Sequence, residues 1–173
     1  MFGELRRPES LARNPNALIP VIEVDDDAQS FVLWESNVIV RYLCAKHALG
    51  SLYPEPLAAR FDAERWMDWQ QTALNRVSAG AFIQWVRTPP SERKTDVIEA
   101  SVQGTEPLFT LLDSHLADRP FVSGDTFTMA DIPLGCEAHR WFASSPLPVV
   151  KLIEATRSSA AKASGYSAST RIV

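Results

Sequence analysis

The sequence has only two cysteines in 173 residues, Cys44 and Cys136, and neither lies in a CxxC or Cys/His spacing. A structural zinc site needs four ligands, so the ligand count excludes one, and we expect no metal. Both cysteines fall in segments with helical spacing. We therefore predict that both are reduced, buried and used as small apolar side chains.

The sequence also lacks a long apolar run and an excess of basic residues. No window is long enough to span a bilayer, and the first seven residues hold no apolar core of a secretory signal. Lys and Arg number 17 against 21 Asp and Glu, and they are scattered along the chain. This pattern argues against nucleic acid or a membrane as partner, so we expect a cytoplasmic protein.

Two apolar runs rich in β-branched residues predict a pair of strands. The first runs from Leu18 to Val24 and the second from Phe31 to Trp34, with Asp25-Asp26-Asp27 between them as a turn. Pro20 has no N–H to donate, so the first strand should begin at or just beyond it. The pair is therefore predicted to form an antiparallel hairpin.

Helical spacing takes over from Ser36. The first helix is predicted to run from Ser36 to Leu49 and to stop at Gly50. The loop SLYPEP then marks a boundary between a domain of residues 1–52 and an all-α domain of residues 53–173. The fold class is thus α+β and mostly α.

Within the all-α domain, three helices are predicted over 57–86, 91–116 and 149–162. Ser91 is the expected cap of the second, and Gly104 with Pro107 should kink or break it. A further helix begins near Thr128, because Thr128 and Asp131 have the spacing of a capping box, with Phe127 placed to pack on Ile132.

Trp66, Trp69 and Trp85 follow one another at helical spacing. Such a stripe favours a place in the core, and a role in lining a hydrophobic substrate cleft is the alternative. His47, His115 and His139 have no nucleophile or acid at a useful spacing, so we interpret them as surface or hydrogen-bonded core residues.

Four segments in a fixed order carry a resemblance to a known family: NPNALIPVIE, LWESNVIVRYLCAKH, RWMDWQQT and SGDTFTMADIPLGCEAHRWF. With them, the chain resembles the cytosolic glutathione transferases from its start to residue 143. The resemblance implies a thioredoxin-like domain followed by an all-α helical bundle. It also implies glutathione as substrate with no separate cofactor, a hydrophobic electrophile as second substrate, and a homodimer.

In this family the residue before a cis-proline lends its backbone to the cysteinyl part of glutathione, and an acidic-Ser pair at a helix start holds the γ-glutamyl end. The resemblance therefore implies that Ile19, a cis Pro20, Glu35 and Ser36 bind glutathione. A helix N-terminus suits a carboxylate, and a neighbouring Glu suits an ammonium, so the residue types agree. The alternative is structural, with Ser36 only an N-cap and Glu35 only a partner of the helix dipole.

The family's catalytic Ser, Tyr or Cys lies in a strand-helix-strand unit before the cis-proline strand, and the present sequence opens at the loop just before that strand. We therefore expect an incomplete thioredoxin-like domain that lacks a unit of roughly 30 residues, and no catalytic residue within this chain. Three functions stay open: a glutathione transferase, a non-catalytic binding or scaffold protein of the same fold, and a truncated gene product.

Overall fold

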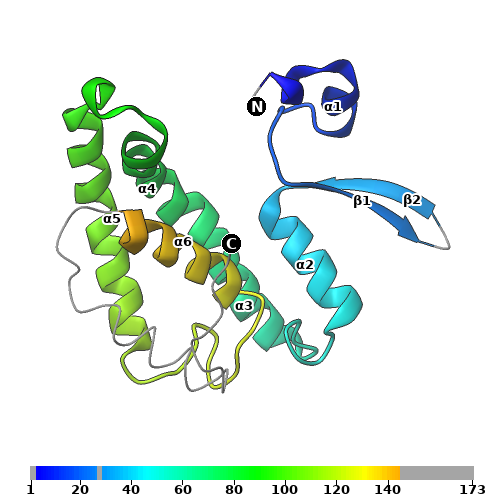
Figure 1. Ribbon diagram of the computed structural model, residues 1–173. Coiled ribbons are helices and arrows are strands. Elements are labelled where there is room, and N and C mark those ends of the chain that lie inside the picture. Colours follow the sequence, from blue (N-terminus) through cyan, green and yellow to red (C-terminus); the bar gives the residue numbers. More distant parts are fainter. Residues whose placement is uncertain (1–2, 27–28, 145–173) are drawn as a thin grey trace, which may run out of the picture. The chain divides into compact units, whose positions relative to one another are not determined.

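The computed structural model describes residues 3–26 and 29–144 (Figure 1). The chain divides into two compact units, Met1–Tyr53 and Pro54–Val173. The helix expected over 149–162 lies outside the described residues. The predicted fold class is confirmed, because a two-stranded antiparallel sheet is accompanied by helices throughout the described chain.

The first unit is a hairpin followed by one long helix. Its elements in chain order are η1 (Glu4–Arg6), α1 (Pro8–Arg13), β1 (Val21–Asp26), β2 (Gln29–Trp34) and α2 (Ser36–His47). The strands pair antiparallel, as predicted, and β1 begins one residue after Pro20.

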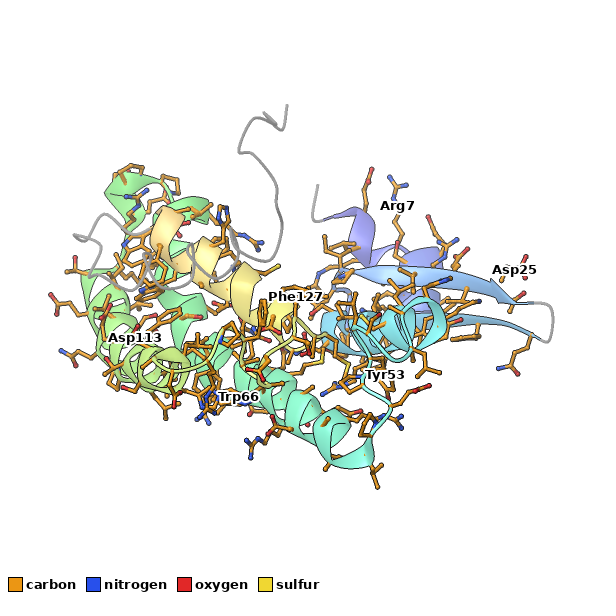
Figure 2. All side chains as sticks on the ribbon, turned by 90° about the horizontal axis from the view of Figure 1, so that it is seen from below. Arg7, Asp25, Tyr53, Trp66, Asp113 and Phe127 are labelled. Atoms are coloured by element: carbon orange, nitrogen blue, oxygen red, sulfur yellow. The ribbon has the colours of Figure 1, made fainter. Side chains whose placement is uncertain are left out.

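The predicted turn at Asp25-Asp26-Asp27 is wrong in its first two residues, because Asp25 and Asp26 continue β1. Asp25 lies opposite Ser30, whose hydroxyl donates a hydrogen bond of 2.6 Å to its carboxylate. This cross-strand bond compensates for the low strand propensity of Asp. Figure 2 shows Asp25 near the far end of the hairpin.

The alternation of side chains gives the hairpin two different faces. One face carries Ile22, Val24, Phe31 and Leu33. The Phe31 ring stands edge-on to Tyr42 of α2, with 5.5 Å between the ring centroids, so this face packs on α2. The opposite face carries Val32 and Trp34, which are 39% and 36% exposed.

Helix α2 ends at His47, two residues before the predicted end. Ala48 already leaves helical backbone geometry, with φ −144°. Leu49 forms an isolated bridge with Tyr53 instead of a last helical turn. Gly50 adopts φ +83°, a left-handed conformation that favours glycine, but the helix has already ended, so the prediction that Gly50 stops it is wrong.

The second unit opens with a helical rod that runs from Leu57 to Arg87. It comprises α3 (Leu57–Trp69), the π-helix η2 (Gln70–Leu74), α4 (Asn75–Phe82) and the π-helix η3 (Ile83–Arg87). The predicted helix over 57–86 is confirmed, whereas its two π-helical turns were not predicted. The remaining elements are η4 (Pro90–Glu92), α5 (Thr95–Leu116) and α6 (Asp131–Ser144).

The prediction for the start of the next helix is wrong, because Ser91 lies in η4 and α5 starts at Thr95 after Lys94. Of the predicted kink or break, the break is wrong, because α5 runs without interruption through Gly104 and Pro107. The kink stays a prediction. Gly104 has a packing role instead. A Cβ atom there would lie 3.3 Å from Cβ of Val77, so the small residue lets α5 approach α4 closely.

The core of the second unit is apolar and aromatic. Trp66 and Trp85 are buried, which agrees with the core alternative for these tryptophans. Phe109 and Trp141 face one another with ring centroids 6.1 Å apart. Cys136 is exposed on α6, so its predicted burial is wrong, whereas Cys44 is buried as expected.

Candidate functional site

The segment before β1 ends in a cis peptide bond between Ile19 and Pro20, as the family resemblance implied. The side chains of Leu18 and Ile19 are 61% and 72% exposed. Two residues earlier, Ala17 has a positive φ of 54°. The backbone of this segment is therefore presented at the surface of the first unit.

Glu35 and Ser36 form the junction between β2 and α2. Glu35 is the N-cap residue: its carbonyl oxygen accepts a hydrogen bond of 3.0 Å from the Ile39 N–H. Ser36 is the first helical residue, so the alternative in which Ser36 is the N-cap is not what the structure shows. Both residues are exposed.

The start of α2 has no capping side chain at Glu35 and no acidic residue in its first turn. The first N–H groups of a helix lack partners within the helix and carry a partial positive charge. The exposed start of α2 is therefore suited to an anionic ligand group.

The register of the hairpin brings the two predicted pairs together. Val21 lies directly opposite Trp34 at the open end of the two strands. Pro20 precedes Val21 and Glu35 follows Trp34, so Ile19-Pro20 and Glu35-Ser36 leave the sheet at the same end. Opposed residues in an antiparallel pair have Cα atoms about 4.5–5.5 Å apart, so the two pairs leave the sheet from neighbouring points.

Two serines near the start of the chain form hydrogen bonds within the first unit. The Ser10 hydroxyl donates to the Glu4 carbonyl oxygen at 2.9 Å, and the Ser30 hydroxyl donates to Asp25. Burial raises the pKa of the Cys44 thiol, which disfavours the thiolate. Each of these three side chains therefore has a structural role.

The described residues hold no group of three or more His, Cys, Asp and Glu side chains placed to bind a metal ion. Within the same residues, no helix combines the length and hydropathy needed to cross a bilayer.

The predicted capping box at the start of α6 is present. The Thr128 N–H donates to Asp131 Oδ2 at 2.8 Å, and the Ala130 N–H donates to Thr128 Oγ1 at 3.4 Å. The carboxylate also accepts the Val122 N–H at 3.0 Å, a contact that local sequence did not predict. Burial raises the pKa of Asp131, although these hydrogen bonds oppose the shift. The packing of Phe127 on Ile132 stays a prediction.

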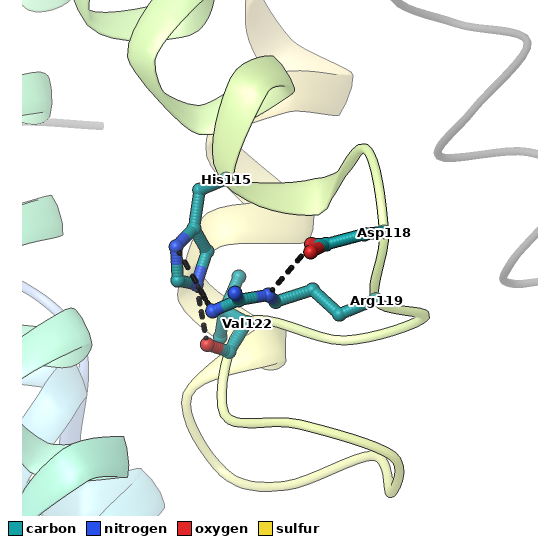
Figure 3. Close-up of polar contacts among 4 residues, drawn as sticks. All are labelled: His115, Asp118, Arg119 and Val122. Atoms are coloured by element: carbon teal, nitrogen blue, oxygen red, sulfur yellow. Dashed lines mark hydrogen bonds and ion pairs between the residues drawn. The ribbon is translucent and has the colours of Figure 1, made fainter.

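The same loop is tied to the end of α5 through His115 (Figure 3). Its Nε2 lies 2.8 Å from the Val122 carbonyl oxygen, to which it donates. Arg119 Nη1 lies 3.4 Å from the other ring nitrogen, Nδ1. The Trp66 ring packs against the imidazole at 4.4 Å between centroids. His115 is thus a hydrogen-bonded residue of the helical unit, as predicted from its lack of a catalytic neighbour.

A buried carboxylate that the sequence analysis missed lies between the rod and α6. Glu137 is 2% exposed and accepts hydrogen bonds from the Ser78 hydroxyl and the Gln70 amide, the latter at 3.3 Å. Arg140 forms an ion pair with it at 3.2 Å. Because Glu137 lies on a helix without a nearby polar motif, only tertiary packing identifies it. Its contacts stabilise the helical unit.

Comparison with known proteins identifies the family. A family model described as glutathione S-transferase, N-terminal domain, matches residues 3–46. The chain is 42% identical to glutathione S-transferase GstB of Escherichia coli over 77% of its own length and 63% of that protein. It is also 28% identical to elongation factor 1-gamma 2 of Oryza sativa, over 80% of the chain and 32% of that protein.

A solved structure of a glutathione S-transferase also matches the chain. The theta class glutathione S-transferase of Xanthomonas axonopodis pv. citri, determined with glutathione bound, matches with a TM-score of 0.79 and 38% identity. The match covers 89% of the present chain and 72% of that protein. With this identity and coverage, the chain belongs to the glutathione transferase family.

Proposed function

We propose that this chain binds glutathione at the open end of the hairpin. The backbone of Ile19, held before Pro20, takes the cysteinyl part of the tripeptide. Ser36 and the start of α2 take the γ-glutamyl carboxylate, and Glu35 takes the neighbouring ammonium. The observation that carries the proposal is the pairing of Val21 with Trp34, which sets these groups at one end of the sheet.

Charge complementarity supports this placement. The γ-glutamyl end of glutathione is a zwitterion, with a carboxylate and an ammonium on one carbon. The start of α2 carries a partial positive charge and lies beside the exposed carboxylate of Glu35, so each ligand charge meets an opposite one. The likeness to a relative solved with glutathione bound agrees with this site.

The site is tested by isothermal titration of the full chain with glutathione. Ser36→Ala removes one charge-assisted hydrogen bond and should weaken binding at least about tenfold. Ser30→Ala is the matched control, because that hydroxyl is also exposed but bonds Asp25 within the hairpin. Equal affinities of the Ser36→Ala variant and the parent chain would contradict the placement.

From the family, we also propose that the chain conjugates the thiol of glutathione to a hydrophobic electrophile. We propose that it does so in the cytoplasm. The test is conjugation of an aryl halide, followed by absorbance, with parent and Ser36→Ala chains at equal concentration. Thiol consumption above the uncatalysed rate, and reduced by the substitution, is the expected outcome.

A second candidate is a binding protein of the same fold without transferase chemistry. The likeness to an elongation factor 1-gamma favours it, since that relative does not carry a transferase name. Glutathione binding without any rate enhancement would select this candidate.

We also propose a homodimer, as the family resemblance implies. Light scattering coupled to size-exclusion chromatography measures it directly. The chain has a mass of 19.2 kDa, so a dimer should elute with twice that mass.

A further inference from the structure

Asn14 is an unusual residue of the first unit because it is polar and almost completely buried. It is 3% exposed. Among residues 3–25 and 29–36, whose exposure is described, it is the sole buried residue. The buried side chain in this part of the chain is therefore an amide and not an apolar group.

The polar groups of Asn14 all have partners. Its Nδ2 donates to the Leu18 carbonyl oxygen at 2.9 Å, and its Oδ1 accepts from the Asn16 N–H at 3.0 Å. Its own N–H donates to the Ser10 carbonyl oxygen, and its carbonyl accepts from the Ala17 N–H. The amide thus closes residues 14–18 into a small loop attached to the end of α1.

The bond to Leu18 orients the peptide that follows. A peptide unit is planar, so fixing the direction of the Leu18 carbonyl also fixes the direction of the Ile19 N–H. The side chains of Leu18 and Ile19 are mostly exposed and provide little packing to hold that plane. The hydrogen bond from the Asn14 amide therefore helps to hold the Leu18 carbonyl, and with it the Ile19 N–H, in one direction.

We propose that Asn14 is a positioning residue for ligand binding: through the Leu18 carbonyl, it aims the Ile19 backbone at the cysteinyl part of glutathione. This inference rests on the proposed function. Asn14 itself does not touch the ligand. It acts on the cysteinyl half of the site and leaves the γ-glutamyl half at Glu35 and Ser36 unaffected.

The test compares two ligands in two variants of the full, ¹⁵N-labelled chain. Asn14→Asp keeps the size of the side chain and its acceptor for Asn16, but places a carboxylate oxygen against the Leu18 carbonyl. Asn16→Asp adds the same charge on an exposed side chain two residues away and is the control. The ligands are glutathione and L-glutamate, which carries only the zwitterionic end.

Asn14→Asp should weaken glutathione binding about tenfold, the effect of about one hydrogen bond, and should change L-glutamate binding by less than about twofold. Asn16→Asp should change neither affinity beyond that margin. An unchanged glutathione affinity in Asn14→Asp overturns the inference while the proposed function stands. An equal loss of affinity for glutathione and for L-glutamate also overturns the inference, because it shows that Asn14 has only a structural role. A parent chain that does not bind glutathione refutes both proposals.

A measurement on the parent chain covers the case in which Asn14→Asp fails to fold, which the loss of the β1 and α2 amide signals would reveal. The side-chain amide protons of Asn14 should exchange slowly with solvent, and the Ile19 N–H signal should shift on glutathione addition. Exchange of the Asn14 protons as fast as those of Asn16, or an unshifted Ile19 signal, would overturn the inference.

Discussion

Replacing Glu35 with Gly is expected to stabilise the chain while weakening glutathione binding. Glu35 has φ 73° and ψ 112°, a region that side chains with a Cβ atom rarely adopt. Such a residue destabilises the fold by about 1–3 kcal/mol. Glycine adopts this geometry without strain but loses about 0.5–1 kcal/mol more backbone entropy on folding. The net expected gain is about 1 kcal/mol.

The binding effect has the opposite sign. The carboxylate of Glu35 is the proposed partner of the ligand ammonium, and a charge-assisted hydrogen bond contributes about 1.5–3 kcal/mol. Glu35→Gly should therefore weaken glutathione binding at least about tenfold. Glu35→Gln is the matched control, because it removes the charge but keeps the Cβ atom and therefore the strain.

Two assays separate the effects. Urea denaturation and amide exchange of β1 and β2 measure stability, and isothermal titration measures affinity. Glu35→Gly should be more stable than the parent, Glu35→Gln should match the parent, and both should bind glutathione weakly. The reasoning is refuted if Glu35→Gly is less stable than Glu35→Gln, or if either variant keeps the parent affinity.

The helical unit provides further predictions. In a helix, Ala is about 0.5–1 kcal/mol more favourable than Gly. Gly135→Ala, where a Cβ meets open space, should gain that stability in thermal unfolding, whereas Gly104→Ala should gain less or lose stability, because its Cβ would lie 3.3 Å from Val77 and force that side chain to shift. Glu137→Ala should lower the free energy of unfolding by about 3 kcal/mol, since it removes the buried carboxylate that accepts from Ser78 and Gln70 and pairs with Arg140; a loss below 1 kcal/mol would contradict this. Burial raises the pKa of Asp131, so its carboxyl stays protonated to higher pH in the folded state than in the unfolded chain. The free energy of unfolding should therefore fall as pH rises from the pKa of Asp131 in the unfolded chain to its pKa in the folded state. Denaturation of Asp131→Asn across that pH window should lack this decline, and an identical pH profile would contradict the shift.

Periodicity in the sequence predicted the elements that are determined by residues close to one another along the chain. The hairpin from Val21 to Trp34 and the rod from Leu57 to Arg87 both follow from local apolar spacing. The capping box of Thr128 and Asp131 was also predicted, because its bonds join residues three apart.

Features that depend on contacts between separate strands or helices were not predicted. The Asp25 to Ser30 bond extends β1 through a segment of low strand propensity. Gly104 permits close packing of two helices and does not break its own. Glu137 is buried because donors 59 and 67 residues away meet it, and nothing in its local sequence signals that burial.

The candidate site was predicted as four residues, and local chemistry alone left their roles open. The register of the hairpin adds the common location of the two pairs, and the backbone of Glu35 adds its N-cap position. In the sequence, Asn14 was only the first residue of the segment NPNALIPVIE. Its burial and its bond to Leu18 emerge from folding of the loop.

The central claim, that the cysteinyl part and the γ-glutamyl end of one glutathione molecule bind at the open end of the hairpin, is tested most directly by mapping amide signals of the labelled full chain during glutathione titration. The account predicts that the largest shifts, saturating together, occur at Ile19 and at residues 35–38. No saturable shift, or shifts concentrated in the helical unit with residues 19 and 35–38 unchanged, would contradict it.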